Sequence, residues 1–373
     1  MILFLNFIPI DFMGGTEKWM NDMAKKLNVY ERTQILSIHP DIANVYGKFV
    51  VKRKYESYIK KSEIHNHISL DTQSFIPFTK KWKDTRKIFF TARLIYTRYE
   101  VLEFFLVLYF SGITGFKKTI AGIHSPFLYS DPISFFDWLH NSLYTSWIYK
   151  YVFHQIKKVH VLNTKDKKYL HETFKLQNVV YVPNGAVIPK IMREKVGNNK
   201  NLLKVLFIGE LSMRKGVDIL LQIIKSTPEN ITFTIAGDGI LKKELLEVEK
   251  KFHNITYQGY AKKDMLDTLY RQHEVLILPS RAESMSLALL EAMSYGLVIL
   301  DSTDTTLGLD RKVEYACSNK NTQSYVSTLK ELCNMKIKNT LHKSYVRNYF
   351  NMNFSSLKID GQLYKNIFEI NTI

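Results

Sequence analysis

The stretch Glu274–Ser302, EVLILPSRAESMSLALLEAMSYGLVILDS, decides the fold class of the chain. It begins with the apolar run Val275–Leu278, which has the length of a buried strand. A polar turn follows, and apolar side chains at helical spacing then predict a helix over 286–295. Gly296 is expected to cap this helix, and residues 297–300 predict a second apolar strand. A strand–helix–strand unit of this kind is typical of a parallel sheet that binds ligands at the carboxyl ends of its strands.

Two glutamates in this stretch are candidate ligand-binding residues. Glu283 lies in the turn before the helix and Glu291 inside it, so at ~1.5 Å per residue they are separated by up to about 12 Å along the axis. Two carboxylates that act on one bond lie roughly 5–10 Å apart. The wider spacing here suits the two ends of one elongated ligand instead. The helix start near Ser286 and Leu287 offers free backbone N–H groups for an anion between them. A carboxylate, an anion site and a second carboxylate, in that order, fit the sugar hydroxyls, the diphosphate and the ribose of a nucleotide sugar. The alternative is a helix with one glutamate near its cap and one facing solvent.

Length and composition limit the class of protein. With 373 residues the chain is long enough for two domains, and 46% hydrophobic with 23% charged residues indicates a globular protein. Two cysteines, Cys317 and Cys333, form neither a metal cluster nor a disulfide framework, so a cytoplasmic location is expected. The net charge of +17 favours an anionic partner. Scattered lysines and the lack of a nucleic-acid motif disfavour nucleic acid, which leaves an anionic membrane surface or general solubility.

Three apolar segments bear on membrane association. The first residues, MILFLNFIPI, predict a strand and not a signal peptide. Residues 104–116 contain two glycines and are shorter than the roughly 20 residues of a membrane span, so they predict a buried or interfacial helix. Residues 135–156 predict one long helix with aromatic side chains on more than one face. This helix either packs in the core or rests partly on lipid.

The first half of the chain contributes two candidate ligand sites. Gly14 and Gly15 lie at a turn between a strand over 2–8 and a helix, where glycines let backbone N–H groups approach an anion. The pattern is not GxGxxG, which disfavours a nicotinamide dinucleotide site. His124 directly follows a strand over 118–123, at the ligand-binding edge of an α/β sheet, although a lone histidine also serves structural roles.

The second half of the chain contributes a cationic loop. Residues 188–204 are polar and basic and predict a linker. A strand over 204–208 then leads into a loop with Arg214 and Lys215, and a helix begins at Val217. Two cations at such a βα loop suit a diphosphate, the alternative being a solvated basic turn.

Three segments, in their order and spacing, carry a family resemblance: FIGELSMRKGVDILLQII at 207–224, TIAGDGILKKEL at 234–245, and ITYQGYAKKDMLDTLYRQHEVLILPSRAESMSLALLEAMSYGLVIL at 255–300. They resemble retaining GT-B glycosyltransferases of the glycogen-synthase-like superfamily (glycosyl transferases group 1). The motif GGTEKWMNDMAKKL, His124 and VPNGAVI add weaker support. The resemblance implies an α/β GT-B fold, with two facing Rossmann-like domains, parallel sheets and an interdomain cleft. Residues 1–187 would bind the acceptor, with a return of the final helix over 345–373, and residues 188–344 would bind the nucleotide sugar.

The resemblance also implies roles for the charged residues. Arg214 and Lys215 would bind the donor diphosphate and stabilise the departing charge. Glu283 would contact the sugar hydroxyls and face the reacting carbon, and Glu291 would hold the ribose. Glu210 stands where many relatives have an arginine, so Arg214 is expected to carry that role.

Further contacts are implied through backbone and histidine groups. Amides near Met285, Ser286 and Leu287 would touch phosphate or sugar. Gly14 and Gly15 would close over the diphosphate, and His124 would contact the donor sugar near its reactive end. Such enzymes need no metal or other cofactor, and the chain has no Asp-x-Asp pair.

The sequence therefore predicts retaining transfer of a hexosyl or related sugar from a UDP- or GDP-sugar to an acceptor hydroxyl. The acceptor would be lipid-linked, a glycan or a protein in glycan, glycolipid or glycoprotein assembly, at the cytoplasmic face of a membrane. Two alternatives stay open. One is a nucleotide-sugar epimerase or phosphorylase, and the other is a non-catalytic subunit that binds sugar nucleotide and supports a partner enzyme.

Overall fold

The computed structural model describes residues 1–7, 15–42, 64–129, 132, 134–189, 201–338 and 340–371. The chain forms two compact units, each built on one parallel sheet, which confirms the predicted α/β class with two Rossmann-like domains. The first unit comprises Met1–His124, Ser142–Val182 and Gly361–Ile373, and the second comprises Ser125–Asn141 and Pro183–Asp360. The predicted domain bounds differ from these units in three respects. Residues 183–187, residues 345–360 and the segment Ser125–Asn141 were assigned to the first domain but belong to the second unit.

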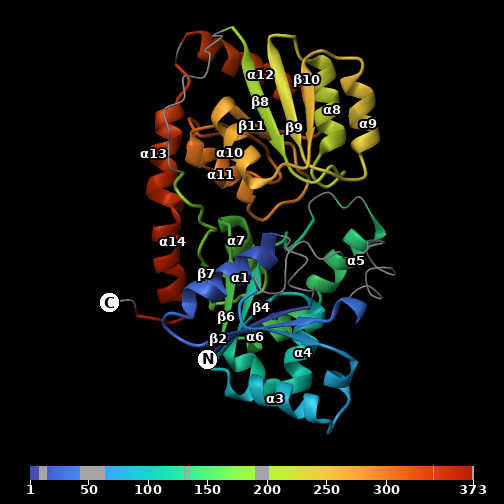
Figure 1. Cartoon of the computed structure of the whole chain (residues 1–373), viewed down its shortest axis with the longest axis vertical. Helices are drawn as coiled ribbons and strands as arrows, with labels where there is room; N and C mark the ends of the chain where they lie inside the picture. Colours follow the sequence, from blue (N-terminus) through green and yellow to red (C-terminus); the bar gives the residue numbers. More distant parts are fainter. Residues whose placement is uncertain are drawn as a thin grey trace. The chain divides into compact units, whose positions relative to one another are not determined.

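The first unit contains a seven-stranded parallel sheet of order β3-β2-β1-β4-β5-β6-β7 (Figure 1). Its strands are β1 (Ile2–Asn6), β2 (Thr33–Ile38), β3 (His67–Leu70), β4 (Leu94–Arg98), β5 (Thr119–Ile123), β6 (Lys158–Val161) and β7 (Val179–Tyr181). Every residue of β1, β2 and β5 is buried. Uninterrupted burial of this kind is typical of parallel strands that are covered on both faces.

Among the described residues between β1 and β7, the α-helices are α1 (Gly15–Leu27), α3 (Lys80–Thr91), α4 (Val101–Ser111), α5 (Phe135–Tyr144), α6 (Trp147–Gln155) and α7 (Thr164–Thr173). The single helix predicted over 135–156 was wrong. Ser146 caps the start of α6 by accepting a hydrogen bond from the Tyr149 amide, and this divides α5 from α6. The helix predicted over 104–116 ends at Gly112, which has a φ of 66°. Among the residues described, no helix is long and apolar enough to cross a membrane.

The second unit contains a six-stranded parallel sheet of order β10-β9-β8-β11-β12-β13 (Figure 1). Its strands are β8 (Leu203–Ile208), β9 (Ile231–Ala236), β10 (Ile255–Gly259), β11 (Val275–Leu278), β12 (Val298–Ser302) and β13 (Glu314–Cys317). Its helices include α8 (Val217–Ser226), α9 (Lys242–Glu249), α10 (Lys263–Gln272), α11 (Leu287–Tyr295), α12 (Thr322–Ile337), α13 (Lys343–Phe354) and α14 (Ser356–Gln362). The predicted strand–helix–strand unit is β11–α11–β12, and Gly296 caps α11 with a left-handed φ of 86°.

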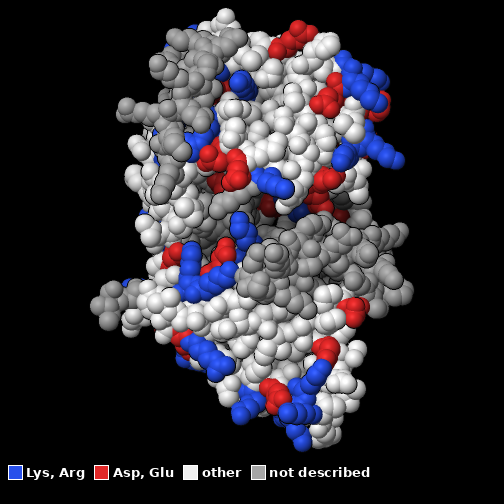
Figure 2. All heavy atoms as spheres, in the orientation of Figure 1, with Lys and Arg blue, Asp and Glu red and all other residues white. Residues whose placement is uncertain are grey.

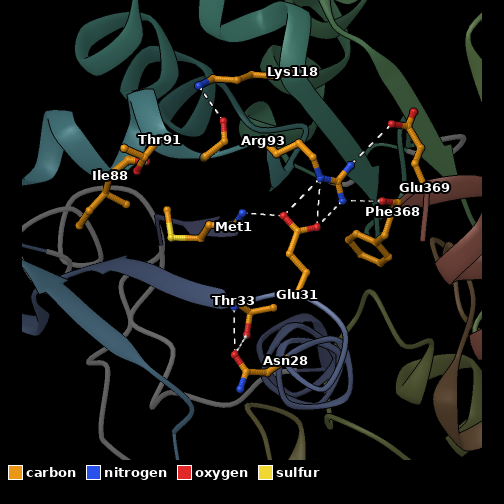
Figure 3. A network of polar contacts seen from close by, with 11 residues as sticks. Met1, Asn28, Glu31, Thr33, Ile88, Thr91, Arg93, Lys118, Phe368 and Glu369 are labelled. Atoms are coloured by element: carbon orange, nitrogen blue, oxygen red, sulfur yellow. Dashed lines mark hydrogen bonds and ion pairs between the residues drawn. The ribbon is translucent and has the colours of Figure 1, made fainter. Parts of the chain in front are cut away.

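The segment that follows α14 belongs to the first unit and is held there by packing and by charge. The ring of Phe368 is fully buried, with its centroid 5.8 Å from that of Phe4 and 5.5 Å from that of Tyr96. Figure 3 shows Arg93 between Glu31 and Phe368. Arg93 pairs with the Glu31 carboxylate and donates a hydrogen bond to the Phe368 carbonyl oxygen at 3.0 Å. Residues far apart in the sequence therefore complete one sheet-based unit.

Candidate functional site

The loops after β8 and β11 lie together in the second unit because these two strands are neighbours in the sheet. Arg281, in the loop after β11, holds the loop after β8. Its guanidinium makes two hydrogen bonds of 2.7 Å to the carboxylate of Asp218 and donates to the Met213 carbonyl oxygen at 2.5 Å. Its backbone amide donates to the carbonyl oxygen of Arg214 at 2.9 Å. This bidentate pair fixes the path of the chain through Arg214 and Lys215.

Gly216 allows the closest approach of the two loops. Its φ of 69° is left-handed, and a Cβ atom at this position would lie 1.8 Å from the Pro279 carbonyl oxygen. Only glycine fits both conditions. The glycine directly before α8 therefore sets how near the cationic loop lies to the loop that carries Glu283.

The two loops bring Lys215 and Glu283 into an ion pair, the central contact of the candidate site. Their side chains are 17% and 20% exposed, so the pair is shielded from water but not sealed. Burial raises the pKa of the Glu283 carboxyl, but the charges of Lys215 and Arg214 and the hydrogen bond from Lys215 outweigh it and lower the pKa below its usual value. The carboxyl is therefore ionised at neutral pH and accepts hydrogen bonds.

Arg214 lies beside this pair and is more exposed. Its guanidinium is 3.6 Å from the carboxylate of Glu210, and both side chains are 39% exposed. An ion pair this open to solvent is weak, so an anionic ligand competes readily for the guanidinium.

The start of α11 follows the same loop. Ser286 is the cap residue and its side chain makes no capping hydrogen bond, so the first amides of the nine-residue helix from Leu287 face no side-chain cap. The side chain of Met285 is buried, and its sulfur accepts a hydrogen bond from the Asn184 amide at 3.2 Å. The Met285 side chain is therefore held within the second unit.

Glu291 lies within α11 and is oriented by the neighbouring helix. The Tyr270 hydroxyl, on α10, donates to its carboxylate at 2.9 Å. The remaining carboxylate oxygen is left to other donors. The predicted role of Glu291 as a ribose ligand stays a prediction.

The other predicted residues belong to the first unit. Gly14 lies outside the described residues, and Gly15 begins α1. His124 follows β5, is partly exposed, and its Nε2 is 2.7 Å from the Tyr96 hydroxyl. Burial lowers the pKa of His124 well below its usual value, and the neighbouring His160 and Arg98 lower it further. The ring is therefore neutral at physiological pH.

Asp301, at the carboxyl end of β12, was missed by the sequence analysis. It is 2% exposed and accepts hydrogen bonds from the Thr305 hydroxyl and the Ser302 amide, both at 2.7 Å. Burial raises its pKa to about 8 against these two hydrogen bonds, and the nearby charges of Glu314 and Glu283 raise it further. An aspartate that ends an apolar strand is the one sequence signal that marks it. Among the described residues, no group of three or more His, Cys, Asp or Glu side chains is suited to a metal ion.

Comparison with known proteins gives a family match for part of the second unit. Residues 203–334 match the family model described as "Glycosyl transferases group 1". An uncharacterized 41.2 kDa protein in the cps region of Klebsiella pneumoniae is 33% identical over 110 residues, which cover 29% of this chain and 30% of that protein. The amylovoran biosynthesis glycosyltransferase AmsD of Erwinia amylovora is 33% identical over 148 residues, 38% of this chain and 42% of that protein. The matches thus span less than half the length of these curated relatives.

Solved structures are similar over the whole chain. Sucrose-phosphate synthase from Thermosynechococcus elongatus has a TM-score of 0.75 and 14% identity, with 99% of each chain covered. HepE of Anabaena in complex with UDP has a TM-score of 0.74 and 14% identity, with 99% of this chain and 100% of that chain covered. At this identity the likeness shows the fold. The chain therefore has the GT-B fold, and the unit that carries Lys215 and Glu283 matches the group 1 glycosyl transferase family over residues 203–334.

Proposed function

We propose that this chain is a retaining glycosyltransferase that moves a sugar from a nucleotide diphosphate sugar to an acceptor hydroxyl in glycan assembly. The observation that carries the proposal is the Lys215–Glu283 ion pair at the carboxyl ends of β8 and β11. A cation for phosphate and a carboxylate for sugar hydroxyls lie in direct contact there. UDP is a reasonable donor nucleotide because the structurally similar HepE has been solved with UDP and with UDP-glucose.

In this proposal the ion pair opens when the donor binds. The diphosphate takes the Lys215 ammonium group and the Arg214 guanidinium, and the first amides of α11 add hydrogen bonds to it. Glu283, which its neighbours keep ionised, then accepts hydrogen bonds from the sugar hydroxyls. As the glycosidic bond breaks, the cations offset the charge that develops on the leaving diphosphate. The departing phosphate accepts the proton of the acceptor hydroxyl, and no metal ion takes part.

The test begins with thermal stabilisation by a panel of UDP-, GDP- and ADP-hexoses, followed by transfer assays with the best donor. Lys215→Met and Glu283→Gln should each lower kcat/KM by about 10² or more, as expected for loss of a group that stabilises transition-state charge. Lys250→Met is a matched control, because Lys250 also pairs with a glutamate, Glu247, on the exposed surface of the same unit. Equal activity of Lys215→Met and the control would overturn the proposal.

The same assays separate the alternatives. An epimerase converts the donor without any acceptor, and a non-catalytic subunit binds the donor without turnover. The anomeric configuration of the product, read by NMR, tests retention. Unchanged transfer in excess EDTA is the expected result for a metal-independent reaction.

We further propose that the acceptor is presented at an anionic lipid surface. One helical stretch in each unit carries exposed aromatic and aliphatic side chains. These are Phe135, Trp138 and Leu139 of α5 in the second unit, and Trp147, Ile148 and Tyr151 of α6 in the first unit. Trp147 is 78% exposed, which is unusual for tryptophan in a water-facing helix. Exposed aromatic residues in a chain of net charge +17 fit the interface of an anionic membrane.

Vesicle flotation tests whether the exposed side chains of α5 and α6 bind lipid. Wild-type protein should float with vesicles that contain phosphatidylserine, and the double variant Trp138→Ser/Trp147→Ser should lose most of that binding. Ile240→Ser/Leu357→Ser is the matched control, since both side chains are at least as exposed but lie on other parts of the chain. Equal binding of the two double variants, or equal binding of wild type to neutral vesicles, would contradict the proposal.

A further inference from the structure

Two crossed contacts, each between a tyrosine and a carboxylate, join the helices α10 and α11 of the second unit. The two helices lie side by side, one before and one after β11 (Figure 1). The Tyr270 hydroxyl on α10 donates to the Glu291 carboxylate on α11 at 2.9 Å. In the opposite direction, the Tyr295 hydroxyl on α11 donates to the Asp267 carboxylate on α10. Each helix thus supplies one donor and one acceptor, and both contacts lie within one unit.

The rings of the two tyrosines are stacked on one another. Their centroids are 5.3 Å apart and the ring planes differ by 21°. Helical spacing explains this arrangement, because residues three or four positions apart share one face of a helix. Asp267 and Tyr270 have this spacing on α10, and Glu291 and Tyr295 have it on α11. The ring packing does not depend on either hydroxyl group, so one hydroxyl can be removed while both rings stay in contact.

The two carboxylates differ in whether a cation reaches them. Arg271 Nε is 2.7 Å from the Asp267 carboxylate, and the same guanidinium lies over the Tyr295 ring, 5.5 Å from its centroid. The hydrogen bonds from Arg271 and Tyr295 lower the pKa of Asp267. Among the residues that the structure describes, no Lys, Arg or His side chain forms an ion pair with Glu291. The contacts of Asp267 are therefore complete within the protein, whereas the Glu291 carboxylate has capacity for a further donor.

This capacity of Glu291 lies at one of its two oxygens. Tyr270 is 2% exposed, and burial, the charge of Glu291 and the hydrogen bond to it raise the tyrosine pKa well above its usual value. The hydroxyl therefore keeps its proton and donates it to Glu291 Oε2. Glu291 Oε1 accepts no hydrogen bond from the described part of the chain and is not a buried atom, so solvent reaches it. The carboxylate is thus held from inside the protein at one oxygen and open at the other.

We propose that Tyr270 is a positioning residue, which holds Glu291 through Oε2 so that Oε1 accepts a hydrogen bond from a hydroxyl group of the bound nucleotide. The identity of the ligand rests on the proposed function, whereas the fixed carboxylate follows from contacts within the second unit. A hydroxyl group fits Oε1 because a carboxylate only accepts hydrogen bonds, and a charged phosphate would be repelled. Tyr295, the other tyrosine of the crossed pair, joins the two helices and has no part in ligand binding.

The first experiment tests the positioning without a ligand. A crystal structure of Tyr270→Phe should show the Glu291 carboxylate in more than one position, because the ring remains and only the hydroxyl that holds Oε2 is removed. Tyr295→Phe is the matched control, since it removes the same group from the other ring of the same stack. In this control Glu291 should keep its wild-type position. A single, unchanged position of Glu291 in Tyr270→Phe would overturn the inference.

The second experiment measures the consequence for binding, using whichever of UDP, GDP and ADP stabilises the protein most. By calorimetry, Tyr270→Phe should raise the Kd for that nucleotide by about three- to tenfold, the size expected for weakening one hydrogen bond. In transfer assays the loss should fall on the KM for the donor and not on kcat, because the nucleotide is held alike in the ground state and the transition state. Tyr295→Phe should leave Kd and KM unchanged. Equal rises of Kd in the two variants, or no rise in Tyr270→Phe, would contradict the positioning role.

A double-mutant cycle tests whether Tyr270 acts through Glu291. In the Glu291→Ala background, Tyr270→Phe should not raise the Kd further, because the carboxylate that it positions is absent. The effect of Tyr270→Phe should also vanish with whichever of the 2′-deoxy and 3′-deoxy forms of the nucleotide lacks the partner hydroxyl group. Full additivity in the cycle, or with both deoxy forms, would overturn the inference.

Failure of the two proposals gives different results. If none of the three nucleotides binds, the proposed function fails and the ligand of Glu291 fails with it, and the crystal structures decide the role of Tyr270. If a donor binds and is turned over while Tyr270→Phe binds the nucleotide like wild type, the positioning role fails and the proposed function stands.

Discussion

At the scale of single residues, two acids of the second unit, the partly exposed Glu283 and the buried Asp301, have pKa values shifted in opposite directions. Glu283 pairs with Lys215, which lowers its pKa despite burial, whereas Asp301 has only neutral hydrogen-bond donors and its pKa rises to about 8. The difference lies in whether a cation reaches the carboxylate. Glu283 is thereby kept charged, as the proposed contact with sugar hydroxyls requires, and Asp301 is kept protonated below its raised pKa.

Asp301 should make the protein less stable as the pH rises. Its pKa is 3.8 as the reference value and about 8 in the folded state, so the folded form holds a proton that the unfolded chain releases above pH 4. Folding therefore becomes less favourable through the window from about pH 4 to pH 8, in total by roughly a few kcal/mol. Asp301→Asn keeps the accepting oxygen and removes the ionisation. Its Tm should exceed that of wild type at pH 9 and match it near pH 4.

Asp238→Asn is the control for this prediction, because Asp238 is 58% exposed in the same unit. Its difference in Tm from wild type should be the same at both pH values. An Asp301→Asn variant with a pH-independent difference in Tm would show that Asp301 is ionised in the folded protein throughout this range.

The sequence predicted some of these residues and not others for a physical reason. Glu283 and Lys215 lie in loops that directly follow predicted strands, so their place at the sheet edge could be inferred. Arg281 and Asp218 are 63 positions apart, and Tyr96 and His160 are 64 apart. Their pairing depends on which strands become neighbours and on side-chain direction, and neither is visible in a local pattern.

At the scale of helices, strands and loops, apolar runs predicted strands well. The run at Val275–Leu278 is β11 with the bounds that were predicted, and the strand predicted over 204–208 is β8, which begins one residue earlier. The prediction failed over 135–156, where aromatic residues continue through the break between α5 and α6. Hydrophobic spacing cannot reveal that break, because it is made by the polar cap at Ser146.

Loop packing at Gly216 should be essential for the candidate site. In Gly216→Ala the Cβ atom would overlap the Pro279 carbonyl oxygen, so the cationic loop must move away from the loop that bears Glu283. We expect kcat/KM to fall by about 10² or more, since small displacements of positioned groups are costly. The Tm should also fall, because the left-handed backbone strain at position 216 and the steric overlap with Pro279 both destabilise the folded state.

Gly259→Ala is a close control for this variant. Gly259 has nearly the same left-handed φ, 70° against 69°, but nothing lies within 4 Å of its added Cβ atom. It should cost roughly 1 kcal/mol of backbone strain and leave kcat/KM unchanged. Equal losses of activity in both variants would assign the effect to backbone strain and not to loop packing.

At the scale of the whole molecule, the face shown in Figure 2 carries charged side chains in several places. Figure 2 shows the described Lys and Arg side chains of the face in view in several separate groups, interspersed with Asp and Glu. A net charge of +17 attracts anionic surfaces at long range. In the proposed function, the specific recognition of phosphate is left to local groups such as Lys215, which pairs with Glu283.

The C-terminal segment of the first unit is held by a charged cluster at Glu369. Its carboxylate is 2.6 Å from Lys157 Nζ, 2.8 Å from Lys158 Nζ and 3.8 Å from Arg93 Nη1 (Figure 3 shows the Arg93 contact). Burial raises the pKa of Glu369, but the hydrogen bonds and charges of the two lysines outweigh it and lower the pKa. The stabilisation is therefore present above the unfolded pKa near 4.5 and is lost as the pH falls below it.

Glu369→Gln should therefore loosen the return of the chain onto the first unit. The side chain is 34% exposed, so after screening we expect a cost of about 1 kcal/mol at pH 7 and low salt, and less in 1 M NaCl. Hydrogen exchange should become faster in residues 363–368 and in β1, because Phe368 packs on Phe4. Glu247→Gln, which breaks an exposed helical pair with Lys250, should leave this exchange unchanged. If Glu369→Gln exchanged like wild type in low salt, the packing of Phe368 and the hydrogen bond from Arg93 to its carbonyl oxygen would hold the segment without the Glu369 carboxylate.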